Sequence, residues 1–175
     1  MADMLVKLYN LPDLEPVLSS LREEKILIRT ASLSERRTID AWVREHFTAS
    51  WAIGCETALT RDPPTLSIAV EVQPHTPSPD SPYDQPPELL LGFACYDAGV
   101  RGMFGPMGVR EDYRGRGIGT ALLLHNLHAM RRAQYGYAVI GWAGPTEFYA
   151  KTVGATIIED SAPGVFRGPL IPTID

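Results

Sequence analysis

The spacing of apolar residues along the chain predicts an alternation of helices and strands. Apolar residues recur at helical spacing within residues 12–24, and Ser32 with Glu35 forms a capping box before a second amphipathic helix. Apolar residues nearly surround the first half of 118–134, which predicts a deeply packed helix, and a short helix is expected over 145–152. Runs rich in β-branched and apolar residues predict strands over 26–31, 66–72, 88–97, 101–109, 137–142, 156–158 and 165–170.

This order of elements predicts one domain of mixed α and β structure. The chain has 175 residues, close to the usual size of a single compact domain. Residues 73–87 hold six prolines, which exclude a helix or an interior strand, so we expect a long exposed loop between two antiparallel strands. Residues 1–24 are interpreted as an N-terminal extension. The strand, helix and strand between 101 and 142 predict a parallel crossover in the middle of the sheet.

Composition and charge narrow the range of partners. The chain carries a net charge of −5 with a mean hydropathy of −0.07, which argues against a broad surface for nucleic acid or anionic membranes and favours a small or cationic partner. The N-terminus lacks a signal-peptide pattern, and the longest apolar stretch is less than half a membrane span, so we expect a soluble cytoplasmic protein.

The two cysteines, Cys55 and Cys95, are too few for a disulfide scaffold and lack the paired spacing of a zinc site. We expect both thiols to be free and no metal to be bound. Cys95 lies in a predicted buried strand, and no neighbouring His-plus-acid pattern supports a nucleophile, so we interpret it as a small apolar core residue.

A glycine-rich run between residues 109 and 122 predicts an anion-binding turn. A predicted strand ends, Gly115, Gly117 and Gly119 alternate, and the long apolar helix begins. The first turn of a helix offers unpaired N–H groups, and Arg114 and Arg116 add positive charge suited to a diphosphate. No lysine follows the glycines as in a nucleotide-triphosphate P-loop. The spacing also departs from the dinucleotide fingerprint, which disfavours nicotinamide and flavin cofactors.

The segment VREDYRGRGIG over 109–119 resembles the acyl-CoA pyrophosphate loop of the GNAT N-acyltransferase superfamily, and FYAKTVGA over 148–155 resembles its C-terminal Tyr-x-Lys-x-Gly segment. The resemblance implies a mixed, mostly antiparallel central sheet with flanking helices, in which two parallel strands splay apart to admit the pantetheine arm. Pro106 lacks an N–H, so the strand ladder is expected to fail near this gap. The implied cosubstrate is acetyl-CoA, held by the backbone of Met107, Gly108 and Val109 and by Arg114, Gly115, Arg116, Gly117, Ile118, Gly119 and Thr120.

The chemistry of acyl transfer to an amine calls for an acid and a base. Tyr149 matches the family's tyrosine and is the candidate acid for the leaving thiolate, because a phenol is protonated at neutral pH. The glycine that follows it, Gly154, lies five residues on, whereas the common pattern has four. Glu56 is the first candidate base, because it follows a helix where this fold shapes its acceptor cleft. A water chain is an alternative, as are Glu71, Glu147 and His46, although His46 lies on an apolar helix face and is interpreted as a core residue.

The prediction is an N-acyltransferase that moves an acetyl or other short acyl group from acyl-CoA to a primary amine, on a small molecule or a protein, by direct attack. The alternative is a non-catalytic acyl-CoA-binding sensor or assembly module, which the altered spacing after Tyr149 keeps open. A third reading is a nucleotide-binding regulator. The strand expected over 165–170 could pair with a second copy of the chain, which makes a homodimer possible.

Overall fold

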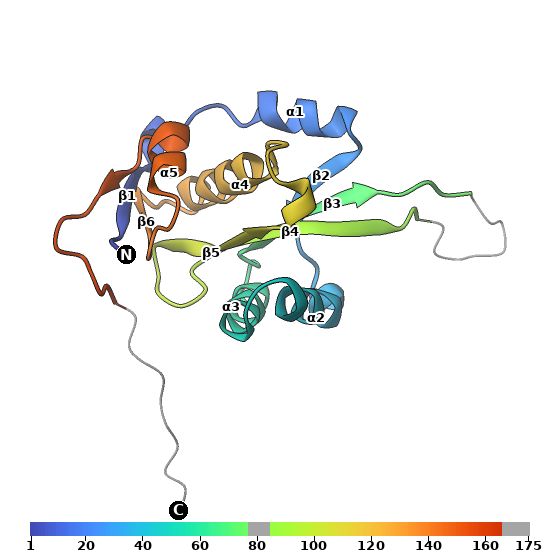
Figure 1. The fold of residues 1–175 in the computed structure, drawn as a ribbon, viewed down its shortest axis with the longest axis horizontal. Helices are drawn as coiled ribbons and strands as arrows, with labels where there is room; N and C mark the ends of the chain where they lie inside the picture. Colours follow the sequence, from blue (N-terminus) through green and yellow to red (C-terminus); the bar gives the residue numbers. More distant parts are fainter. Residues whose placement is uncertain (77–84, 166–175) are drawn as a thin grey trace, which may run out of the picture.

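The computed structural model describes residues 1–76 and 85–165, and within them it forms a single sheet with helices on both faces (Figure 1). The strands are β1 (Met4–Lys7), β2 (Ile26–Thr30), β3 (Leu66–Val72), β4 (Glu88–Tyr96), β5 (Met103–Val109), β6 (Tyr137–Ile140) and β7 (Thr156–Ile157). The helices are α1 (Glu15–Glu23), α2 (Arg36–His46), α3 (Ala49–Leu59), α4 (Ile118–Arg132) and α5 (Thr146–Val153), with short 3₁₀ turns at Leu8–Asn10, Leu33–Glu35 and Glu111–Tyr113.

The seven strands of the sheet lie in the order β2-β3-β4-β5-β6-β1-β7. Every neighbouring pair is antiparallel except β5 and β6, which run parallel and are joined through α4. The structure is therefore the mixed, mostly antiparallel sheet with one parallel pair that the sequence predicts, and the crossover lies where it is expected.

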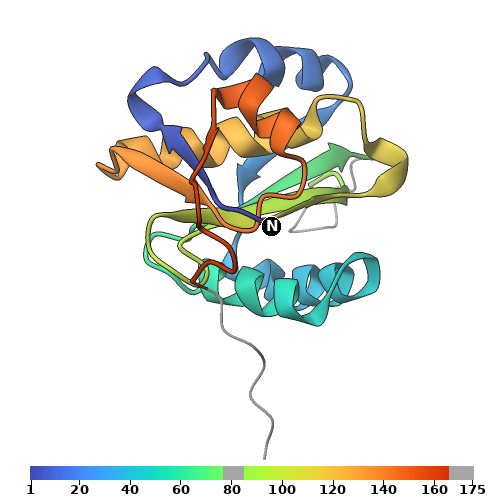
Figure 2. The same ribbon diagram turned by 60° about the vertical axis from the view of Figure 1, so that its left-hand side comes forward.

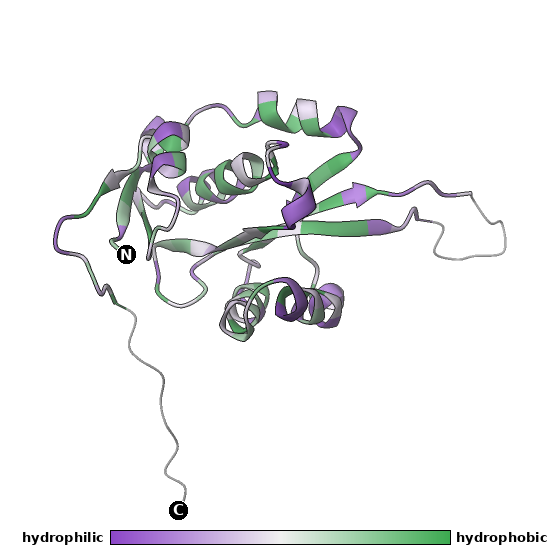
Figure 3. Ribbon diagram, in the orientation of Figure 1, coloured by the Kyte–Doolittle hydropathy of each residue, from purple (hydrophilic) through white to green (hydrophobic). Residues whose placement is uncertain are grey.

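The helices divide into two layers, one on each face of the sheet (Figure 2). On one face α1, α4 and α5 cover an apolar cluster that includes the buried Leu122, Leu123 and Leu127 of α4. On the other face α2 and α3 cover a second cluster around Phe93. Figure 3 shows the result along the chain: α4 and the central strands are largely hydrophobic, whereas the segment after β5 is hydrophilic.

Most elements occur where the apolar pattern predicts them. The strands expected over 26–31, 66–72, 88–97, 101–109 and 137–142 are present, and the helices expected over 12–24, 118–134 and 145–152 agree in position with α1, α4 and α5. The capping box of Ser32 and Glu35 is formed, with the Ser32 N–H donating to the Glu35 carboxylate at 2.6 Å. Of the strand expected over 165–170, only Val165 lies among the described residues. Of the proline-rich loop over 73–87, only the two ends do.

The structure differs from the sequence prediction at the N-terminus and in the region after α2. The segment interpreted as an N-terminal extension contributes β1, which was not expected and which pairs with both β6 and β7. A further helix, α3, contains Glu56 rather than preceding it, because α3 is apolar on most sides and shows no polar stripe in the sequence. The interpretation of His46 as a core residue is wrong: α2 ends there, Phe47 takes the inward position, and His46 is exposed.

The parallel pair separates soon after it forms. Only Met103 with Val139 and Phe104 with Ile140 are paired between β5 and β6, although β5 continues to Val109. The separation begins at Gly105 and Pro106, where proline offers no N–H to a neighbouring strand. The expected failure of the ladder near Pro106 is therefore confirmed.

Candidate active site

One edge of β5 has no strand partner from Gly105 to Val109 in the described part of the chain. The opposite edge pairs with β4 from Met107 to Val109, with Met107 opposite Ala94 and Val109 opposite Gly92, and the register shifts before Phe104 pairs with Tyr96. Five residues of strand span about 16 Å at about 3.3 Å per residue. This length of open backbone can accept an extended chain that carries amide groups, as an added strand would.

The direction of each backbone group along this edge follows from the pairing with β4. The N–H of Arg110 donates to the Leu91 carbonyl on β4 at 2.8 Å. Because successive residues of a strand point their N–H and C=O groups to opposite sides, Val109 and Met107 direct theirs away from β4, toward the open edge. Gly108 turns its own N–H and C=O toward β4. Within the predicted set of Met107, Gly108 and Val109, Met107 and Val109 therefore face the open edge, where the Val109 carbonyl already accepts a hydrogen bond from Arg114 Nε at 3.2 Å.

The open edge leads directly to the N-terminus of α4. Gly117 is the residue before this helix, and no side chain caps it and no acidic residue lies in its first turn. The N–H groups of Ile118, Gly119 and Thr120 are consequently available, at the positive end of the helix dipole. The helix ends with Arg131 and Arg132, which complement its negative end. An anion at the N-terminus would complete this pattern.

The turn before α4 depends on glycine at two positions. Gly115 has a φ of +80° and Gly117 a φ of +84°, both in the left-handed region that side chains disfavour. Gly119 has no such requirement, but a Cβ there would approach the Val109 side chain at 3.9 Å and the Phe148 ring at 4.0 Å. Gly119 therefore lies between the end of β5 and helix α5, in the space that an arm along the open edge would use.

The two arginines of the turn are held differently. Arg114 is exposed, and its Nε donates to the Val109 carbonyl at 3.2 Å, with no carboxylate partner among the described residues. Arg116 donates from Nε and Nη2 to the Glu24 carboxylate, at 3.0 and 2.5 Å. The sequence pattern treats the two arginines alike, whereas in the described structure Arg116 has a carboxylate partner and Arg114 bonds only to a backbone carbonyl.

Tyr113 connects this turn to the sheet. Its hydroxyl donates to the Glu71 carboxylate on β3 at 3.0 Å, and this hydrogen bond raises the pKa of the Tyr113 phenol. The guanidinium groups of Arg110 and Arg116 lie over the Tyr113 ring, at 4.7 and 4.8 Å from its centre. The sequence gives no signal for the Tyr113 hydroxyl, because its partner Glu71 lies 42 residues away.

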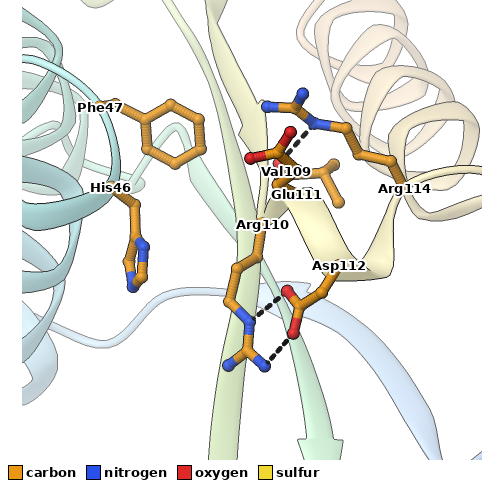
Figure 4. A pocket seen from close by; sticks show the side chains of 7 residues that line it. All are labelled: His46, Phe47, Val109, Arg110, Glu111, Asp112 and Arg114. Atoms are coloured by element: carbon orange, nitrogen blue, oxygen red, sulfur yellow. Dashed lines mark hydrogen bonds and ion pairs between the residues drawn. The ribbon is translucent and has the colours of Figure 1, made fainter.

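A cleft of about 460 Å³ opens between the end of α2 and the segment that follows β5 (Figure 4). Its lining residues are His46, Phe47, Val109, Arg110, Glu111, Asp112 and Arg114. In Figure 4 His46, the last residue of α2, and Phe47, which follows it, face the other residues across the cleft, and Arg110 binds Asp112 through two hydrogen bonds of 2.6 Å each. The cleft thus joins the open end of β5 to exposed polar groups, including His46.

The α2 side of the cleft is aromatic. Phe47 stacks on Trp51 with ring centres 5.4 Å apart and meets Phe93 edge-on at 5.5 Å. A Cβ on Gly108 would lie only 2.6 Å from the Phe47 ring, so this ring rests directly on the backbone of β5. Sequence reasoning did not identify Phe47 as a site residue, because its contact is with a glycine that carries no side-chain signal.

Tyr149 is buried on α5, beside Phe148, and burial raises the pKa of its phenol. Its hydroxyl has no hydrogen-bond partner among the described residues. The hydroxyl is therefore protonated at neutral pH and free to donate. The role of Tyr149 as an acid stays a prediction.

Glu56 does not line the cleft. Its carboxylate pairs with Arg36, and both residues line a separate hollow of about 310 Å³ on the outer surface of α2 and α3. A role as base would require this ion pair to open. Of the other candidates, Glu71 accepts the Tyr113 hydroxyl, and His46 lines the cleft. The base remains a prediction, with His46 the candidate that the structure brings to the end of β5.

The cysteines and the possible metal ligands complete the description of the chemical groups. Cys95 is fully buried beside Cys55, and burial raises the pKa of its thiol, so the position agrees with the interpretation of Cys95 as a core residue. Within residues 1–76 and 85–165, no group of three or more His, Cys, Asp or Glu side chains is arranged to hold a metal ion.

No helix in the described part of the chain is both long and apolar enough to cross a membrane.

The open strand edge and the uncapped helix N-terminus occur together in the part of the chain that matches a known family. The model of the acetyltransferase (GNAT) family matches residues 37–154, which is more than half of the chain. The chain belongs to the GNAT acetyltransferase family, as its loop and tyrosine segments predict. A comparison with curated proteins gives no match.

Solved structures show the same fold at low sequence identity. A GCN5-related glucosamine N-acetyltransferase region of a fungal multi-domain GH3 β-N-acetylglucosaminidase aligns over 90% of this chain and 19% of that chain, with a TM-score of 0.66 and 16% identity. A GCN5-related N-acetyltransferase from Sphaerobacter thermophilus aligns over 90% of this chain and 48% of that one, with a TM-score of 0.61 and 20% identity. The chain thus spans less than half the length of these two structures. At such identities the likeness shows the fold alone.

Proposed function

We propose that this protein transfers an acetyl or other short acyl group from acyl-CoA to a primary amine by direct attack. The observation that carries the proposal is the open edge of β5, which runs from Gly105 to Val109 and leads into the uncapped N-terminus of α4. An acyl-CoA has the matching order of groups, because two amides of its pantetheine arm precede a diphosphate. Membership of the GNAT family supports the same cosubstrate.

Each part of the site has a defined task in this proposal. Met107, through its N–H and C=O, and Val109, through its N–H, exchange hydrogen bonds with the amides of the arm, and the N–H groups of residues 117–120 bind the diphosphate. Arg114 adds a guanidinium that has no carboxylate partner among the described residues and whose Nε donates to the Val109 carbonyl. With the diphosphate at the turn, the arm runs back along β5 and brings the thioester toward Gly105 and Pro106, where β5 and β6 part.

The reaction needs the amine to attack the thioester carbonyl and the thiolate to leave. The nitrogen lone pair forms the new bond to carbon, the carbon–sulfur bond breaks, and the departing sulfur takes a proton. Tyr149 supplies that proton from its unpartnered hydroxyl, and a base or a water chain takes the proton released by the amine. A backbone N–H near the parting strands can stabilise the oxyanion.

A thiol-release assay with acetyl-, propionyl- and longer acyl-CoA donors against a broad panel of amines tests the proposal. We expect release of free CoA with at least one amine, and we expect Tyr149→Phe to lower kcat at least tenfold, since one proton donor contributes about 10²–10⁴-fold. Tyr9→Phe, at an exposed position far from α5 in the sequence, is the matched control and should leave kcat unchanged.

Calorimetry with CoA separates the possible outcomes. Absence of CoA binding by the wild-type protein contradicts the proposal. Saturable CoA binding without turnover for any amine favours the alternative of an acyl-CoA-binding sensor or assembly module, which the five-residue spacing from Tyr149 to Gly154 keeps in view. If ATP or NAD binds as tightly as CoA, the protein is instead a nucleotide-binding regulator.

A further inference from the structure

The end of α1 lies against the loop that precedes α4, although the two are far apart in the sequence. Glu24 follows the last residue of α1, and its carboxylate accepts both hydrogen bonds from Arg116, 92 residues away. A Cβ on Gly117 would lie 3.6 Å from the Val17 side chain of α1. The N-terminal segment therefore contacts the loop through both a charged and an apolar group.

We propose that Glu24 is a positioning residue for the cosubstrate: it holds Arg116 so that the Gly115–Gly117 turn is preformed, and it leaves Arg114 as the arginine whose side chain meets the diphosphate. This inference rests on the proposed function, because it assigns the loop to CoA. The backbone N–H of Arg116 keeps its predicted place in the anion site, while its side chain braces the turn.

The contacts of Arg116 support a brace rather than a phosphate ligand. Its guanidinium makes two hydrogen bonds to Glu24 and lies over the Tyr113 ring, whose hydroxyl is in turn bound to Glu71 on β3. Movement toward a phosphate would break these contacts with both neighbours. The loop is thus fastened to α1 on one side and to the sheet on the other.

Arg114 has the opposite character. Only its Nε is engaged, by the Val109 carbonyl, which leaves both terminal nitrogens free to donate in a fork to phosphate oxygens. Arg110, the third arginine near the turn, is bound to Asp112 through two hydrogen bonds. Arg114 is therefore the one of these three arginines without a carboxylate partner among the described residues.

The position of Glu24 is itself fixed by the fold. Its backbone N–H donates to the Leu21 carbonyl at 3.0 Å, and β2 begins at Ile26, two residues later. The carboxylate thus stands on a short corner between a helix and a strand of the sheet. A loop that is already in its binding conformation loses less entropy on binding, and so binds its ligand more tightly.

The opposite role for Glu24, that of a competitor that occupies Arg116 until a phosphate displaces it, predicts an effect of opposite sign. As a positioning residue, Glu24 strengthens CoA binding, so Glu24→Gln weakens it. As a competitor, Glu24 weakens CoA binding, so Glu24→Gln strengthens it. The sign of one measurement therefore decides between the two roles.

The test is calorimetry with CoA on the full chain of the wild type and of Glu24→Gln, Arg116→Gln, the double variant and Glu23→Gln. Glu23→Gln removes the same charge one residue earlier, at an exposed position, and so measures the general effect of charge. We expect Glu24→Gln and Arg116→Gln each to raise the Kd about three- to fivefold, the range of a partly exposed ion pair. The double variant should be no weaker than Arg116→Gln, because both substitutions break one contact.

The dependence of the Kd for CoA on ionic strength distinguishes a residue that contacts the ligand from one that only supports the loop. Arg114→Gln should raise the Kd and flatten its dependence on ionic strength, because a charge contact with the ligand is lost. Glu24→Gln should raise the Kd and leave that dependence unchanged. Thermal unfolding shows that each variant is folded, and Glu24→Asp, which keeps the charge on a shorter side chain, should give an intermediate Kd.

The inference is overturned if Glu24→Gln binds CoA as tightly as Glu23→Gln or more tightly, or if the effects of Glu24→Gln and Arg116→Gln add. A flattened salt dependence in Arg116→Gln, with none in Arg114→Gln, also overturns it, because Arg116 is then the phosphate ligand. Absence of CoA binding by the wild type contradicts the proposed function instead, so the two failures are distinguishable.

Discussion

At the scale of single residues, the three alternating glycines of the loop do different work. Gly115 and Gly117 are required by their positive φ angles, whereas Gly119 adopts an ordinary helical conformation. What Gly119 provides is space, since its missing side chain keeps the interval between Val109 and Phe148 open. Glycine thus permits a backbone conformation at two positions and leaves space at the third.

Alanine substitutions should separate these two uses. Gly117→Ala forces a side chain into a left-handed conformation and should lower the free energy of unfolding by about 1–2 kcal/mol. Gly119→Ala should keep or slightly raise stability, because alanine favours a helix over glycine by about 1 kcal/mol, yet it should raise the Kd for CoA. Thermal unfolding and calorimetry measure the two effects. Unchanged CoA binding in a stable Gly119→Ala variant would show that the arm does not pass this position.

Residue patterns reveal the site only where it is built locally. The turn from Arg114 to Thr120 could be predicted because its glycines, its arginines and the start of α4 are contiguous in the sequence. The partners that fasten the turn could not, since Glu24 lies 92 residues from Arg116 and Glu71 lies 42 residues from Tyr113. Only the folded chain shows that Arg116 pairs with a carboxylate whereas Arg114, among the described residues, does not.

At the scale of elements, the packing of the end of α2 against β5 shapes the cleft. Phe47, at the end of α2, rests on Gly108 and is held from behind by Trp51 and Phe93. These contacts fix the distance between the helix and the strand whose other edge is open. The contact between the Phe47 ring and Gly108 is therefore one of those that position α2 relative to β5, together with the buried Ile39 and Val43 of α2.

Gly108→Ala should disturb the contact between the Phe47 ring and β5. The new Cβ would lie 2.6 Å from the Phe47 ring, and because the ring is enclosed by other aromatics, we expect an overpacking cost of about 1–3 kcal/mol in the free energy of unfolding. In a Phe47→Leu background the same substitution should cost less than about 1 kcal/mol, since the smaller side chain leaves room. Chemical denaturation of the four proteins gives the coupling energy; equal costs in the two backgrounds would show that the ring moves aside freely.

Element prediction failed where pairing or burial overrides local pattern. The strand β1 has only four residues, and its place between β6 and β7 is decided by partners on both edges rather than by its own apolar pattern. The helix α3 buries Ala52, Cys55 and Ala58 against the sheet and carries few polar residues, so no amphipathic stripe marks it. The long helix α4 and the central strands, with continuous apolar sequence, were predicted close to their bounds.

At the scale of the whole molecule, α4 connects the proposed diphosphate site to the sheet along its full length. Its N-terminus faces the proposed diphosphate, and its middle carries His125, whose Nδ1 lies 2.9 Å from the Ser67 hydroxyl on β3. Burial lowers the pKa of His125 below 6.5, and the nearby Arg132 and His128 act in the same direction. The imidazole is thus kept neutral in the layer between helix and sheet.

This neutral histidine should make the protein sensitive to mild acid. In the unfolded chain His125 takes up a proton near pH 6.5, whereas the folded chain resists protonation until a lower pH, so the unfolded state binds more protons as pH falls below about 6.5. Stability should therefore decline in that window, by at most about 1.4 kcal/mol per pH unit for one proton. The carboxylates held by arginine, such as Glu35 beside Arg29, have pKa values below 4.5 and act at lower pH.

Unfolding measured from pH 7.5 to 5.0 in the wild type and in His125→Asn tests this prediction. Asparagine keeps a polar atom near the Ser67 hydroxyl but does not titrate, so the loss of stability below pH 6.5 should shrink even if the variant is less stable at pH 7.5. His128→Gln, one helical turn further along α4, is the matched control and should keep most of the wild-type decline, because burial is the main cause of the lowered pKa of His125 and His128 only adds to it. If the slope between pH 6.5 and 5.0 is the same in His125→Asn and the wild type, the acid sensitivity comes from other groups, and the layer beneath α4 does not exclude the charged imidazole.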